Sequence, residues 1–130
     1  MKTENFSAVT KFSEVRWPDI PDQPGVYVIY DEGEVIYVGM AGRNGRGSLR
    51  RRLKDHSSGQ MVNMFSQYLY LARVQFLVEE RISHPKVAKV ACHSYIEQRC
   101  SFRYRVTDSG DEARKLEDHL KAELRPTLNS

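Results

Sequence analysis

The chain has 130 residues, of which 40% are hydrophobic and 28% charged, and a formal net charge of +3 at pH 7. This length supports one domain with a single modest core, and the composition is ordinary for a soluble globular protein. A surplus of three positive charges is too small to identify a nucleic-acid-binding protein by itself.

Simple inspection of the sequence disfavours several other classes of protein. Cys92 and Cys100 are the only cysteines and form no CxxC pair, which argues against a zinc knuckle and against a disulfide scaffold. Residues 1–13 lack the apolar core of a signal peptide, and no segment approaches the length of a membrane span. We therefore expect a cytoplasmic protein that does not enter a membrane.

The chain divides into an extension and a main domain. Residues 1–22 form the expected extension, which packs on the core through an apolar cluster of Phe12, Val15 and Trp17. Residues 23–130 form the main domain. Prolines before and at the boundary keep the approach to the first strand extended.

The main domain opens with an expected β-hairpin. Gly25–Tyr30 and Glu34–Gly39 are rich in β-branched and aromatic residues, and the turn-forming residues 31–33 separate them. If those three residues make the loop, Tyr27 faces Tyr37 across the strands. Two phenols would then stand side by side on one face of the sheet.

A basic segment follows the hairpin. Residues 40–47 form a glycine-rich loop, which is not a P-loop because no Gly-Lys-Ser/Thr follows it, and Ser48 is a good N-cap for a helix that extends to about His56. Six cations and no acid occur up to Lys54: Arg43, Arg46, Arg50, Arg51, Arg52 and Lys54. This local charge is typical of a phosphate-binding surface, and a solvated basic loop is the alternative.

The middle of the chain is expected to be mostly helical. Met61–Leu71 reads as an amphipathic helix with Met61, Met64, Phe65, Tyr68 and Leu71 on one face. Residues 73–82 fit either a strand or a helix. Residues 87–99 form a further expected helix, in which Val87, Val90, Ala91, Ser94 and Tyr95 recur at helical spacing.

The last part of the chain completes an expected α/β fold. Residues 102–106 alternate as a strand with Phe102, Tyr104 and Val106 inward, and a capping box of Ser109 and Glu112 begins a final helix that ends before Pro126. We therefore predict a small, mainly antiparallel, three-stranded sheet flanked by helices.

Glu117 is the most informative single residue of the final helix. The apolar stripe of that helix consists of Ala113, Leu116, Leu120 and Leu124, and the spacing places Glu117 on the same inward face. An unpaired buried carboxylate is unfavourable by several kcal/mol, so a cation should lie beside it. Without further signals, a buried salt bridge and a metal ligand are equally good interpretations.

Taken in order, these residues resemble the GIY-YIG nuclease superfamily. The resemblance starts with Gly25–Tyr27 and Tyr37–Gly39, continues through Arg52 and Glu117, and ends at Asn129, so that it covers most of the chain. The paired tyrosine blocks are its specific part. The later residues become specific only as a set.

The resemblance implies a metal-dependent endonuclease that hydrolyses phosphodiester bonds of DNA. Glu117 would then bind Mg²⁺ or Mn²⁺, which fits the preference of these ions for oxygen ligands. Arg52 would stabilise the charge of the transition state, with Arg50 or Arg51 as alternatives. Arg43, Arg46 and Lys54 would join these arginines in contacting nucleic acid.

The resemblance also assigns roles to the remaining site residues. Tyr27 would activate the attacking water and Tyr37 would orient the water or the phosphate, although the two assignments could be reversed. His56 lies one helical turn after Arg52 and would join the catalytic set. Asn129 would brace the site by hydrogen bonds. Gly25 and Gly39 would be structural.

Two departures and two alternatives accompany the resemblance. Valines replace both isoleucines of the family motif, and Met40 stands where many relatives have a lysine or another polar residue. One alternative is a catalytically silent nucleic-acid-binding module on the same fold. The other is a scaffold or interaction domain. A single active site cuts one strand at a time, so a homodimer is a further expectation.

Overall fold

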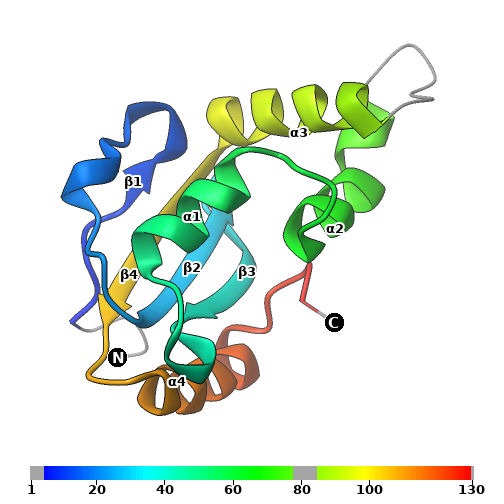
Figure 1. The fold of residues 1–130 in the computed structure, drawn as a ribbon. Helices are drawn as coiled ribbons and strands as arrows, with labels where there is room; N and C mark the ends of the chain where they lie inside the picture. The colour runs from blue at the N-terminus through cyan, green and yellow to red at the C-terminus, as the bar shows by residue number, and fades with distance from the viewer. Residues whose placement is uncertain (1–4, 78–84, 130) are drawn as a thin grey trace.

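The computed structural model describes residues 5–77 and 85–129, which form an α/β fold around one antiparallel sheet (Figure 1). The sheet has the order β1-β4-β2-β3, with β1 at Thr10–Lys11, β2 at Gly25–Asp31, β3 at Glu34–Ala41 and β4 at Cys100–Val106. The α-helices are α1 at Leu49–Ser57, α2 at Met64–Ala72, α3 at Pro85–Arg99 and α4 at Gly110–Leu124. No helix within these described ranges is both long and apolar enough to cross a membrane.

The sheet has four strands, and the prediction of three was therefore wrong. The additional strand comes from the N-terminal extension, where Thr10 pairs with Phe102 of β4. Phe12 then buries its ring 4.8 Å from that of Phe102, and Trp17 stacks on the same ring at 6.4 Å between centroids. The extension is thus part of both the sheet and its core.

The two faces of the sheet carry different helices. One face holds Tyr27 and Ile29 in a core that includes side chains from α1, α2 and α3. The opposite face holds Val26 and Val28 in a smaller core with Ala113 and Leu120 of α4. In Figure 1, α4 accordingly lies away from the other three helices.

The hairpin register differs from the predicted one. The connection is a two-residue turn, Glu32 and Gly33, both with positive φ, and a bulge between Ile29 and Tyr30 shifts the pairing. Tyr27 therefore pairs with Gly39 rather than with Tyr37. Because side chains alternate along a strand, Tyr27 and Tyr37 still share a face, as diagonal neighbours.

The predicted burial pattern of two helices was also partly wrong. In α2, Met64 and Leu71 are 47% and 59% exposed, whereas Phe65 and Leu69 are fully buried. Asn63 caps this helix through a hydrogen bond from the Ser66 amide, so the helix starts later than predicted.

In α3, Val87 and Val90 are exposed, and the buried side chains include Ala88, Cys92 and Ile96. The buried face of α3 is therefore offset from the one predicted, with Tyr95 the predicted position that remains buried. Of the ambiguous segment 73–82, Val74–Phe76 forms a short 3₁₀-helix, and residues 78–82 lie outside the described residues.

The predictions for the last strand and helix were largely correct. Phe102 is buried as expected, whereas Val106 at the strand end is 38% exposed. Ser109 Oγ accepts the hydrogen bond of the Glu112 amide, as in a capping box. The reciprocal bond is displaced by one residue, because Glu112 Oε2 accepts from the Asp108 amide.

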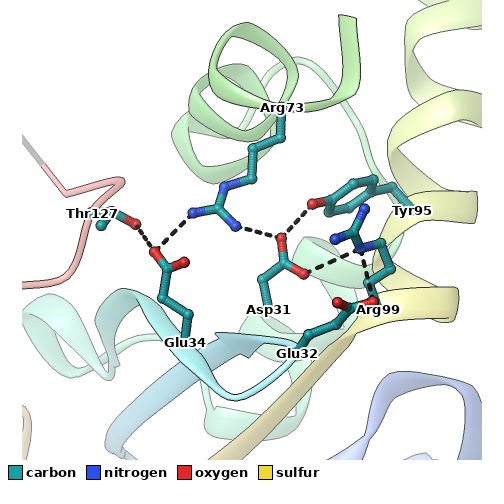
Figure 2. A network of polar contacts seen from close by, with 7 residues as sticks. All are labelled: Asp31, Glu32, Glu34, Arg73, Tyr95, Arg99 and Thr127. Carbon is teal, nitrogen blue, oxygen red and sulfur yellow. Dashed lines mark hydrogen bonds and ion pairs between the residues drawn. The ribbon is translucent and has the colours of Figure 1, made fainter. Parts of the chain in front are cut away.

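A network of charged groups holds the turn of the hairpin against α2 and α3 (Figure 2). The buried Asp31 carboxylate accepts hydrogen bonds from Arg73 Nη1 at 2.7 Å and from the Tyr95 hydroxyl. Arg99 Nε lies 3.4 Å from the other carboxylate oxygen. Arg73 also donates to Glu34 at 2.9 Å. Arg73, directly after α2, and Arg99, at the end of α3, thus connect both helices to the turn of the hairpin.

Candidate active site

The site begins with the two tyrosines of the hairpin. The rings of Tyr27 and Tyr37 lie 6.5 Å apart and nearly parallel. Tyr27 leans across Gly39, where a Cβ atom would come within 2.3 Å of the Tyr27 hydroxyl oxygen. Gly39 is therefore the residue that lets Tyr27 occupy this position. Gly25 is similarly constrained, since a Cβ there would come within 2.3 Å of the Arg105 carbonyl oxygen.

His56 lies directly behind the tyrosines. Ser48 caps α1 by accepting from the Arg51 amide, and the helix carries His56 to a fully buried position. The His56 Nε2 atom lies 2.6 Å from the Tyr27 hydroxyl oxygen. Its ring also makes an edge contact with Phe65. His56 is therefore enclosed by aromatic rings, which sequence reasoning had not shown.

Burial fixes the protonation state of His56. Desolvation, assisted by the Arg52 charge, lowers the pKa of His56 to about 3. The imidazole is therefore neutral at physiological pH. With Nδ1 carrying the ring proton, Nε2 accepts the proton of the Tyr27 hydroxyl.

The two phenols are held in their neutral form by the same effect. Burial raises the pKa of Tyr27 far above its ordinary value, the neighbouring Tyr37 raises it further, and Arg52 opposes both. Burial likewise raises the pKa of Tyr37, while Arg52 lowers it and Glu117 raises it. A phenolate would therefore need additional positive charge in the site.

The three consecutive arginines of α1 have different positions. The Arg52 side chain lies beside both phenols. Arg50 instead donates to the main-chain oxygen of Ile20 at 2.8 Å and that of Pro18 at 3.3 Å, which ties the helix to the N-terminal extension. Arg51 lines the same pocket as Arg52. Of these three arginines, Arg52 is thus the one whose charge acts on both tyrosines.

Glu117 approaches the site from the other side. It is buried in α4, with 7% of its surface exposed, and Lys121 Nζ lies 3.7 Å from its Oε2 atom. Burial raises the pKa of the Glu117 carboxyl, and the positive charges of Lys121 and Arg43 oppose that rise. The inward position of Glu117 and the neighbouring Lys121 both agree with the prediction of a buried carboxylate beside a cation.

The tyrosines, Arg52 and Glu117 meet at one pocket of about 510 Å³, which His56 and Arg50 do not line. Its wall includes both tyrosines, the glycine loop, α1 and α4. The polar and charged lining residues are Tyr27, Tyr37, Arg43, Arg46, Ser48, Arg51, Arg52, Asp55, Glu117 and Lys121. Lys54 is exposed on α1 and does not line this pocket. Five cations and two carboxylates thus surround a space next to the tyrosines.

Asn129 secures the edge of the sheet beside the tyrosines. Its Oδ1 accepts from the Val38 amide at 2.7 Å, and its Nδ2 donates to the Val38 carbonyl oxygen at 3.0 Å. The Leu128 amide donates to the Ile36 carbonyl oxygen at 2.8 Å. The asparagine therefore acts as a strand partner for the residue between Tyr37 and Gly39.

The donor set of the pocket is compatible with a hard divalent cation. Glu117 and Asp55 are the pocket's carboxylates, and the described residues contain no cluster of three or more histidine, cysteine or acidic side chains suited to a metal. Mg²⁺ is commonly held by one or two carboxylates, with water and phosphate oxygens completing its coordination. Glu117 can hold Mg²⁺ in this way. Among the described residues there are not enough suitable side chains to surround the ion with protein ligands alone.

Two charged residues of the pocket, Lys121 and Asp55, were not predicted from the sequence. Lys121 lies four residues after Glu117 and Asp55 three residues after Arg52, so helical spacing alone could have placed each beside its partner. The other histidines that the structure describes, His93 and His119, pair with Glu97 and Glu123 on their own helices. Neither lines the pocket.

The comparisons with known proteins give no further guidance: the sequence matches no family model and no curated protein.

Proposed function

We propose that the protein is a metal-dependent endonuclease of the GIY-YIG type that hydrolyses phosphodiester bonds of DNA. The observation that carries the proposal is the meeting of Tyr27, Tyr37, Arg52 and Glu117 at one basic pocket. These residues lie on the two strands of the hairpin, on α1, which follows soon after, and on α4, which is far away in sequence. A buried carboxylate among arginines has a chemical use in such a site, because it can bind a cation that phosphate chemistry requires.

The proton path of the proposed reaction starts at Tyr27. When neutral His56 carries its ring proton on Nδ1, its Nε2 atom, 2.6 Å from the Tyr27 hydroxyl oxygen, accepts the phenol proton, so the phenol oxygen can take a proton from the attacking water while passing its own to the imidazole. The low pKa of His56 makes this transfer unfavourable in the free protein. A bound phosphate adds negative charge and makes it more favourable.

Arg52 and Tyr37 complete the proposed protein contribution. The Arg52 guanidinium lies beside both phenols and can donate two parallel hydrogen bonds to a phosphate, stabilising the additional charge of the transition state. Tyr37 orients the water or the phosphate. When bound at Glu117, Mg²⁺ or Mn²⁺ would supply Lewis-acid polarisation of the scissile phosphate.

The basic residues around the pocket would hold the nucleic acid. Arg43, Arg46 and Arg51 line the pocket and can contact phosphates on either side of the scissile bond. Lys54 extends the same charge along α1. Arg50 already donates to the main chain of the extension, so its proposed contribution is to hold α1 in place.

A catalytically silent nucleic-acid-binding module is the second candidate function. The basic lining of the pocket would serve it equally well. Glu117 counts against it, because without a metal a buried carboxylate beside the phosphate would weaken binding. This single residue therefore separates the two candidates.

The experiment that tests the proposal is nicking of supercoiled plasmid in Mg²⁺ or Mn²⁺. We expect cleavage by the wild type, and its loss with a chelator or in Glu117→Gln, which keeps the shape of the side chain. Asp118→Asn is the matched control, because this neighbouring acid is exposed and does not line the pocket. Plasmid binding without cleavage by the folded wild type would favour the silent module. Cleavage that persists in Glu117→Gln would mean that the site is wrong.

A further inference from the structure

We propose that Lys121 is a resident counter-ion of Glu117 that leaves the carboxylate for a substrate phosphate when a divalent metal binds. This inference rests on the proposed function and concerns the regulation of the same site. Lys121 would thereby couple metal binding to nucleic-acid binding.

The contact between the two side chains is suited to exchange. Lys121 Nζ and Glu117 Oε2 are 3.7 Å apart, which is an ion pair but longer than a normal hydrogen bond. The lysine side chain is 36% exposed, whereas that of the glutamate is 10% exposed. The carboxylate is therefore fixed, and the ammonium group is the partner that can move.

The position of Lys121 in the pocket would allow its ammonium group to contact a bound phosphate. Lys121 and Glu117 are the two α4 residues that line the pocket, so the lysine lies on the wall that carries the carboxylate. Arg52 and the phenols lie on another wall. A phosphate between these walls would be within reach of a lysine, whose four-carbon stem and compact charge allow it to reorient more freely than an arginine.

Simple charge counting separates the effect of the metal from that of the exchange. While Lys121 pairs with Glu117, the two groups together contribute no net charge to the pocket. A divalent cation on the carboxylate raises this local charge to about +2, and release of Lys121 adds no charge but frees its ammonium group to contact the phosphate. Metal binding would thus strengthen the attraction for phosphate, and nucleic acid would strengthen metal binding by the same factor.

An ordinary Glu–Lys pair at i,i+4 is the competing explanation of this contact. Such a pair contributes a little to helix stability and has no effect on catalysis. The two explanations differ in the sign of two measurements on Lys121→Met, which removes the charge but keeps most of the side-chain length. The exchange model predicts tighter metal binding together with slower cleavage, a combination that loss of helix stability does not produce.

The experiment measures Mn²⁺ binding by calorimetry without nucleic acid, and plasmid nicking at saturating Mn²⁺. For Lys121→Met we expect Mn²⁺ to bind about two- to fivefold more tightly, because the competing cation is gone. We expect nicking to slow by about tenfold or more, because a donor to the phosphate is lost. Lys121→Arg keeps the charge and should restore the weaker Mn²⁺ binding. Lys115→Met, an exposed lysine on the same helix that does not line the pocket, should change neither quantity.

The outcomes separate this inference from the proposed function. Mn²⁺ affinity or nicking that is the same in Lys121→Met as in the wild type overturns the role of Lys121 and leaves the nuclease intact. If Mn²⁺ binds neither the wild type nor Lys121→Met, both the metal role of Glu117 and the exchange are overturned. Opposite changes in the two measurements, with Lys115→Met unchanged, support the exchange.

Discussion

Two buried carboxylates lie at different places in this molecule and have very different surroundings. Asp31, at the turn of the hairpin, contacts two arginines and a tyrosine hydroxyl (Figure 2). Glu117, on α4, has one lysine at 3.7 Å. Both are more than nine-tenths buried. The comparison teaches that the same degree of burial can accompany different roles: removing the surrounded Asp31 should break several contacts, whereas Glu117 has fewer protein partners and can accept a ligand.

The largest expected effect is at Asp31. In Asp31→Ala, the Arg73 and Arg99 guanidinium groups lose their shared partner, and the Tyr95 hydroxyl loses its acceptor. We expect the free energy of unfolding to fall by about 3 kcal/mol, as for other broken buried ion pairs. Urea denaturation measures this change. Glu34→Ala is the control, because Glu34 is half exposed and should contribute less than about 1 kcal/mol. Equal losses in the two variants would contradict a special role for Asp31.

The second prediction concerns the buried His56 behind the tyrosines, which should make the stability of the protein depend on pH. The pKa of His56 is about 3 in the folded protein and near 6.5 when unfolded, so below about pH 6.5 the unfolded state binds the additional proton. Stability therefore falls as the pH is lowered, by up to about 1.4 kcal/mol per pH unit for this group.

The measurement is the difference in unfolding free energy between the wild type and His56→Gln at pH 6.5 and at pH 5. We expect the wild type to lose about 2 kcal/mol relative to the variant over this interval. His119→Gln alters an exposed histidine and serves as the control. A difference that does not change with pH would mean that His56 is not buried as a neutral group.

Glu117 should give an effect of opposite sign to that of Asp31. In Glu117→Met an apolar side chain joins the stripe of Ala113 and Leu120, and the desolvated carboxylate is removed. We expect the free energy of unfolding to increase by about 1 kcal/mol, a common gain when a functional residue is replaced by one that packs well. Thermal denaturation at pH 7 measures it. A clear loss of stability would mean that the Lys121 pair is a structural contact.

The smallest expected effect is at the tail. Asn129→Asp keeps the acceptor for the Val38 amide but removes the donor to the Val38 carbonyl oxygen. We expect a loss of about 0.5–1 kcal/mol, confined to the edge of the sheet. Hydrogen exchange of the amides around Val38 should accelerate, whereas those of β4 should not change. Uniform acceleration throughout the sheet would show that the tail supports the entire fold.

Local chemistry predicted much of this fold from the sequence. The hairpin, the Ser48 and Ser109 caps, and the inward position of Glu117 each follow from residues within one short segment of the chain. The fourth strand could not be predicted, because two residues at Thr10–Lys11 have no periodicity to recognise. The bulge after Ile29 left no signal either, since it depends on how β3 fits its neighbours.

The candidate site shows the same division between local and long-range information. Its residue types and order were visible in the sequence. The distinction between Arg50 and Arg52 was not, because it depends on contacts of Arg50 with the distant Pro18 and Ile20. The valines of α3 misled the prediction for a related reason. Val87 and Val90 are exposed although they are apolar, because the face that α3 buries depends on elements distant in sequence.

The bond between Asn129 and Val38 has a consequence for the order of events during protein synthesis. The two residues are separated by 91 positions. A growing chain acquires the tyrosines and Arg52 early, and α4 with Glu117 late, but β3 lacks its edge partner until residue 129 has left the ribosome. The pocket can therefore reach its final geometry only after residues 25–129 have all been synthesised, although its tyrosines and Arg52 are made much earlier.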